Sequence, residues 1–139
     1  MPISFHSEDV SFLPKKRRAL RHWIEHCIVS EGCTAGDIAY IFCSDEHLLE
    51  MNREHLKHDY YTDIITFDYS DGKRLSGDLF ISIDRVRDNA KTLRISFPDE
   101  LHRVMIHGVL HLAGHGDKTK ADAANMRILE ESCLTLRQF

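Results

Sequence analysis

The run Ile38–Cys43 is nearly continuous in apolar and β-forming side chains. A strand with this pattern is buried on both faces, so it belongs inside a sheet that other elements cover on each side. The chain has 139 residues, which is about enough for one core of ordinary size. We therefore expect one domain, residues 1–139, built around a small covered sheet.

Further apolar segments flank this run as strands and helices in an irregular order. Strands are expected at 3–6, 64–67 and 79–83, and helices at 20–28, 44–56, 84–93 and 97–112 and in the C-terminal segment after Thr119. Ser44, Asp84 and Thr119 are the expected caps of three of these helices. The order lacks the strict alternation of a Rossmann domain. The sequence predicts an α+β fold, with a small mixed β-sheet of about four strands covered by about five helices.

The charge balance limits how this molecule can bind nucleic acid. The chain has 18 Lys and Arg against 22 Asp and Glu, a formal net charge of −4. Such a molecule lacks the overall basic field of a dedicated nucleic-acid binder, so any contact with phosphate must be local. The densest basic cluster is Lys15, Lys16, Arg17, Arg18 and Arg21, which is either a solvated helix face or a patch that contacts phosphate.

Cysteine usage and hydropathy indicate a cytoplasmic location. The four cysteines form no C-x-x-C pair, and we expect them to be buried free thiols of a reducing compartment. The N-terminal segment does not resemble a secretion signal, and no apolar run is long enough to span a bilayer. The sequence therefore predicts a cytoplasmic protein with no membrane partner.

Two of the ten histidines have the spacing of metal ligands. His107 and His111 lie one turn apart on one face of the helix predicted from Phe97 onward. Gly114 can end that helix and turn the chain back, which brings Asp117 or His115 toward the pair. The pattern H-x-x-x-H-x-x-G-x-x-D has the spacing of a metzincin zinc site. It predicts a metal site at the end of a central helix with ligands His107, His111 and Asp117, and His115 as the alternative third ligand.

The residue between the two histidines argues against a peptidase. A zinc protease of this type uses a glutamate after the first histidine as general base, and here that position is Gly108, which cannot take up a proton. Gly108 also lies on an apolar stripe, so we expect another backbone to pack tightly against it.

Other polar residues are expected to have structural or surface roles. Glu100 shares the face of the two histidines and is expected to be a surface glutamate, although it could orient a ligand. Asp63 is expected to form hydrogen bonds at the start of a strand, with a general base as the alternative. The remaining helical histidines are assigned to helix surfaces or margins: His22, His26, His47, His55 and His102.

The segment His107–Gly114 resembles the signature of the YbeY family of metal-dependent endoribonucleases. Residues 52–67 and 76–82 are similar to two further blocks of that family, in the same order along the chain. The resemblance implies a hydrolase that cleaves single-stranded RNA during rRNA maturation, at the 3′ end of 16S rRNA, and that acts in ribosome quality control. It implies rRNA and the small ribosomal subunit or its proteins as partners. The alternative is a non-catalytic ribosome-assembly factor with a structural metal.

Two positions depart from the family pattern. The family usually has a third histidine where this chain has Asp117, so zinc is the expected ion, with iron, manganese or nickel as alternatives beside a carboxylate. The family also commonly carries an arginine important for activity where this chain has Leu56. Phosphate stabilisation must then come from elsewhere, and the neighbouring candidates are Arg53, Lys57 and His58.

Overall fold

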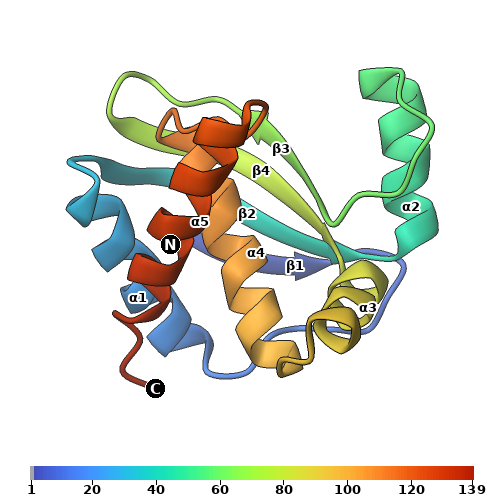
Figure 1. The fold of residues 1–139 in the computed structure, drawn as a ribbon, viewed down its shortest axis with the longest axis horizontal. Coiled ribbons are helices and arrows are strands. Elements are labelled where there is room, and N and C mark those ends of the chain that lie inside the picture. The colour runs from blue at the N-terminus through green and yellow to red at the C-terminus, as the bar shows by residue number, and fades with distance from the viewer. Residues whose placement is uncertain (1) are drawn as a thin grey trace.

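A four-stranded mixed sheet lies at the centre of the computed structural model, which describes residues 2–139 (Figure 1). Its strands are β1 (Ile3–Ser7), β2 (Thr34–Cys43), β3 (Ile64–Asp68) and β4 (Arg74–Ser82). They lie in the order β1-β2-β4-β3, with β1, β2 and β4 parallel and β3 antiparallel at one edge. The predicted α+β fold with a mixed sheet is therefore confirmed.

Five α-helices surround the sheet within the described residues. They are α1 (Arg17–Ser30), α2 (Asp45–Met51), α3 (Ile83–Leu93), α4 (Phe97–Leu112) and α5 (Lys120–Leu134), and a π-helical turn, η1 (Asn52–Leu56), extends α2. Figure 1 shows α4 running across the sheet with α5 beside it. No described helix is long and apolar enough to cross a membrane.

Both faces of the central sheet are covered, as the apolar run in β2 predicts. Tyr40 and Phe42 belong to the main core, which α1, α4 and α5 complete. Cys43 joins a smaller core on the other face with Leu48 of α2 and Ile65 of β3. Ile64 of the edge strand β3 lies against Gly108 in the C-terminal half of α4, and Ile65, on the other face, packs in the smaller core with Leu48.

The helix α4 has the boundaries that the sequence predicts. Ser96 caps its first turn through a hydrogen bond from the Asp99 N–H, and the chain turns at Gly114 with φ of 100°. Gly108 does pack closely, but against side chains and not against a backbone as expected. A Cβ added there would lie 2.8 Å from the Ile64 Cδ1 of β3 and 3.3 Å from the Leu79 side chain of β4. Glycine thus lets α4 lie close to the sheet.

One of the three expected caps is wrong. Ser44 and Thr119 cap α2 and α5 as predicted. The cap of α3 lies two residues earlier than expected, because Ser82 caps the helix by accepting a hydrogen bond from the Arg85 N–H. Asp84 lies within the first turn, where its carboxylate accepts a hydrogen bond from the Asp45 N–H.

The cysteines are free thiols as predicted, and the exposure of the basic cluster leaves both of its interpretations open. Arg21 of the cluster is half-buried, donates to the Ile3 carbonyl oxygen and lies over the Phe5 ring, while residues 15–18 are exposed. Three cysteines are buried, Cys33 is half-buried, and no disulfide joins any of the four.

His102 is buried, whereas the sequence predicted a helix surface or margin. It is 9% exposed and lies between Trp23 and Phe139, with ring centroids 5.7 and 5.5 Å away. Arg137 donates a hydrogen bond of 2.8 Å to its Nδ1. Burial, with the charge of Arg137, lowers the pKa of His102 to about 4. The C-terminal segment covers this side of α4, and helical periodicity alone cannot reveal that cover.

His102 is expected to make the protein less stable in acid. Because its pKa is about 4 in the folded state and near 6.5 unfolded, the unfolded chain binds the proton first as the pH falls. The stabilisation that depends on neutral His102 is therefore present above about pH 6.5 and is lost progressively toward pH 4. The free energy of unfolding falls by up to about 3 kcal/mol over this range. Urea unfolding between pH 7 and pH 4.5 measures this loss. In His102→Leu the fall should be smaller, and an identical fall in both proteins would contradict the prediction.

Candidate metal centre

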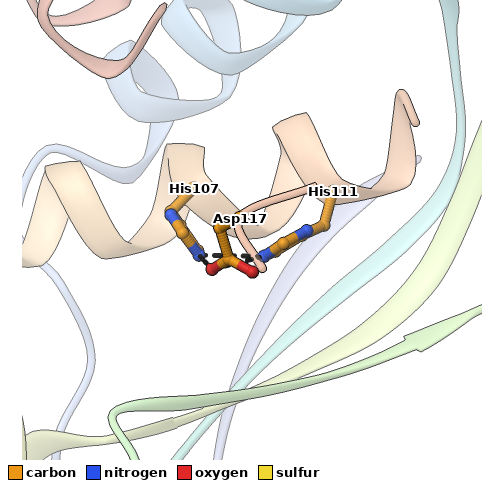
Figure 2. A group of neighbouring side chains, drawn as sticks. All are labelled: His107, His111 and Asp117. Atoms are coloured by element: carbon orange, nitrogen blue, oxygen red, sulfur yellow. Dashed lines mark hydrogen bonds and ion pairs between the residues drawn. The ribbon is translucent and has the colours of Figure 1, made fainter. Parts of the chain in front are cut away.

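His107 and His111 project from the last two turns of α4 toward Asp117 in the loop that follows (Figure 2). The two Nε2 atoms are 2.9 Å apart. The Asp117 Oδ2 lies 3.3 Å from the His107 Nε2 and 3.4 Å from the His111 Nε2. Three donor atoms from two elements thus converge on one point.

The remaining nitrogen of each imidazole is held by an acceptor. The His107 Nδ1 lies 2.5 Å from the Glu130 Oε2 of α5, and the His111 Nδ1 lies 2.8 Å from the His115 carbonyl oxygen. Both Nδ1 atoms must donate to these oxygens, so in the neutral rings both Nε2 atoms carry lone pairs. Two lone pairs that face each other at 2.9 Å repel unless a cation or proton lies between them.

The donor set fits a divalent metal ion. Ligands bound at about 2.0–2.1 Å in tetrahedral geometry are roughly 3.3 Å apart, which is close to the three separations observed here. Two imidazoles and a carboxylate are also a ligand set that suits zinc, and that iron, manganese and nickel accept. Within residues 2–139, His107, His111 and Asp117 form the one group with this convergence.

His115, the alternative third ligand, does not join this group. Its Nε2 lies 2.5 Å from the Glu31 Oε1, and its backbone carbonyl holds the His111 ring. The geometry favours Asp117 over His115, and the choice of ligands stays a prediction until metal is measured.

A buried ionic network behind His107 was missed by the sequence interpretation. Arg103 binds Glu100 through two hydrogen bonds of 2.7 and 2.6 Å and reaches Glu130 at 3.2 Å. Glu100 is fully buried and Glu130 is 2% exposed, so the expected surface position of Glu100 is wrong. Burial raises the pKa of Glu130, but the hydrogen bond from His107 and the charge of Arg103 outweigh it and hold the pKa below its usual value.

A pocket of about 580 Å³ opens over the three converging donors. The side of α4 that carries the histidines forms one wall, and the edge strand β3 with the end of η1 forms the other. Its lining residues include Leu56, Thr62, Asp63 and Lys118. Burial raises the pKa of Asp63 and the nearby Arg103 opposes that rise. The Asp63 carboxylate accepts a hydrogen bond of 3.4 Å from the Asn89 side-chain amide and lies 3.7 Å from the Arg103 guanidinium. Its expected hydrogen-bonding role and the alternative role as a general base both stay predictions.

The sequence neighbours of Leu56 do not line this pocket. Arg53 pairs with Asp59 at 2.6 Å, and the His58 Nδ1 lies 2.5 Å from the Tyr60 hydroxyl. The three candidates for phosphate stabilisation near Leu56 are thus exposed and outside the pocket, Lys57 included.

Comparison with known proteins shows the family to which this chain is similar. The sequence profile described as Endoribonuclease YbeY matches residues 3–137. The chain belongs to the YbeY family. Membership supports an endoribonuclease role, and so a hydrolase that acts on RNA.

Individual relatives agree over nearly their whole length. The chain is 50% identical to the Endoribonuclease YbeY of Bacteroides thetaiotaomicron over 99% of this chain and 100% of that protein. It is 48% identical to the protein of the same name from Parabacteroides distasonis, over 98% and 96% of the two chains. Among solved structures, the solution structure of TM1509 from Thermotoga maritima superposes with a TM-score of 0.62 at 25% identity, over 96% of this chain and 89% of that one. The fold is therefore shared with a solved structure, and the two relatives agree with the family assignment.

Proposed function

We propose that this protein is a metal-dependent endoribonuclease specific for single-stranded RNA. The observation that carries the proposal is the convergence of His107, His111 and Asp117 beneath an open pocket in a YbeY-family chain. Zinc is the proposed ion, and iron, manganese and nickel fit the same donors.

The residues around the pocket would have three roles: metal binding, orientation of the ligands and formation of the pocket wall. A divalent ion held by the three donors would polarise a phosphoryl oxygen and lower the pKa of a bound water. Glu130 and the His115 carbonyl fix the two imidazole rings so that both Nε2 atoms face the pocket. Leu56 and Ile64 contribute apolar side chains to the lining of the pocket that holds the three donors.

The proposed substrates and partners come from the family resemblance. They are precursor rRNA, with the 3′ end of 16S rRNA as the cleavage region, and the small ribosomal subunit or its proteins during quality control. A cytoplasmic location follows from these partners.

The non-catalytic ribosome-assembly factor is the second candidate, and one observation favours it. Residues 15–18 form an exposed basic patch in no ion pair within the described chain, which could dock on RNA without cleaving it. A chelator separates the two candidates. Loss of folding would indicate a structural metal, whereas loss of cleavage with folding intact would indicate a catalytic one.

Replacing His111 with alanine is expected to remove both the bound metal and RNA cleavage. Only His107 and Asp117 would remain of the three metal donors. Metal content per chain and cleavage of a single-stranded oligoribonucleotide measure the two effects. The exposed His22→Ala is the matched control and should retain both. Cleavage by His111→Ala at the wild-type rate would mean that the nuclease is a contaminant. If Asp117→Ala retained the metal and His115→Ala lost it, the assignment of Asp117 as the third ligand would be wrong.

A further inference from the structure

The pocket over the candidate metal ligands carries more negative than positive side chains. Asp63, Asp68 and Asp117 contribute three carboxylates to its lining, and Lys118 is the one Lys or Arg that lines it. A nucleic-acid strand is a polyanion whose phosphates need nearby cationic groups. An ion held by His107, His111 and Asp117 would offset the Asp117 carboxylate, and the Asp63 carboxylate lies 3.7 Å from Arg103. A phosphate bound beside that ion still needs a cation of its own.

The other cations around the pocket are already committed to carboxylates. Arg103 is bound by the buried Glu100 and Glu130 and also lies 3.7 Å from the Asp63 carboxylate. Releasing it would leave Glu100 and Glu130 buried without this partner. Arg53 lies outside the lining and pairs with Asp59.

Lys118 differs from these arginines because it lines the pocket and is not paired with a carboxylate of the described chain. It is exposed, it follows Asp117 directly in the chain, and within residues 2–139 its ammonium forms no ion pair. It therefore keeps the mobility and the charge to meet an incoming anion. A lysine acts on phosphate as a flexible point charge and needs no fixed fork geometry.

We infer that Lys118 binds a phosphate group of the RNA strand in this pocket, beside the group that is cleaved. This inference rests on the proposed function, because it names the residue that offsets the carboxylates at that same site. Leu56 lies at the end of η1 and lines the same pocket. A cation introduced at Leu56 should then be able to substitute for Lys118.

Two measurements test the assignment on the metal-loaded protein. The first is cleavage of a single-stranded oligoribonucleotide, and the second is binding of a 2′-O-methyl oligonucleotide of the same sequence across a range of salt concentrations. Lys118→Ala is expected to slow cleavage roughly tenfold to a hundredfold, the loss that corresponds to one hydrogen bond to a charged group. It should also reduce the slope of log K against log salt by about 0.7, the value for one lost phosphate contact on a single strand. Metal content should stay unchanged.

The control and rescue variants fix the interpretation. Lys120→Ala removes a nearby exposed lysine that does not line the pocket, and it should leave the cleavage rate and the salt slope as in wild type. Lys118→Arg should retain both, and Leu56→Arg added to Lys118→Ala should restore the slope. An unchanged slope and rate in Lys118→Ala, beside an active wild type, would overturn the role of Lys118 alone. A wild type that neither cleaves nor binds RNA would overturn the proposed function and this inference with it.

Discussion

Replacing Arg103 with methionine is expected to lower the free energy of unfolding by about 3–5 kcal/mol at pH 7. The guanidinium is the cation that offsets Glu100, which is fully buried, and Glu130, which is 2% exposed. Without it, two carboxylates remain in the core, and the loss of a partner from a buried ion pair costs more than the pair contributes. The hydrogen bonds of Arg103 to Glu100 raise its own pKa further, so the arginine stays charged at every working pH. Urea unfolding of the metal-free protein measures the effect.

Arg127→Met is the matched control for this variant. Arg127 is also an arginine near Glu130, but it is exposed and lies 3.9 Å away, so its removal should change stability by less than about 1 kcal/mol. In Arg103→Met the deficit should shrink between pH 7 and pH 5, because protonation removes the charge from the unpaired carboxylates. A deficit as small as that of Arg127→Met would mean that water or another group already satisfies the two carboxylates.

The sequence predicted most of the fold because its signals are local. The apolar run in β2 and the caps at Ser44 and Thr119 each depend on residues within a few positions of one another. The helical spacing of His107 and His111, and the turn at Gly114, are local in the same sense. Such patterns persist whatever packs against them, so they could be read without knowledge of the tertiary structure.

The cap of α3 was a local error, whereas the wrong positions of Glu100 and His102 concern burial by distant segments. Glu100 and His102 lie near the start of α4 and were both assigned to its surface or margin. Asn89 of α3 contacts the buried Glu100, and Arg137 of the C-terminal segment contacts the buried His102. One signal for Glu130 was available. It follows Met126 by four residues, so it lies on the buried face of α5, where an unpaired glutamate would be very costly. That position predicts a buried partner, although it does not identify Arg103 or His107.

Replacing Glu130 with glutamine is expected to weaken metal binding roughly tenfold to a hundredfold. The Glu130 Oε2 lies 2.5 Å from the His107 Nδ1, so the carboxylate holds the ring with its Nε2 toward Asp117 and makes that nitrogen a stronger donor. Glutamine keeps the shape and one acceptor oxygen but lacks the charge. Zinc titration against a competing chelator measures the affinity, and unfolding of the metal-free protein measures stability separately.

Glu131→Gln is the control for this variant, because Glu131 is the next residue on α5 and its side chain is exposed. It should bind zinc as the wild type does. If Glu130→Gln lowers the stability of the metal-free protein but leaves zinc affinity unchanged, Glu130 serves only to balance Arg103. If the zinc affinity falls while the His107 and His111 rings remain in place, Glu130 strengthens His107 as a metal ligand. The packing of the core and the chemistry of the site would then depend on the same carboxylate.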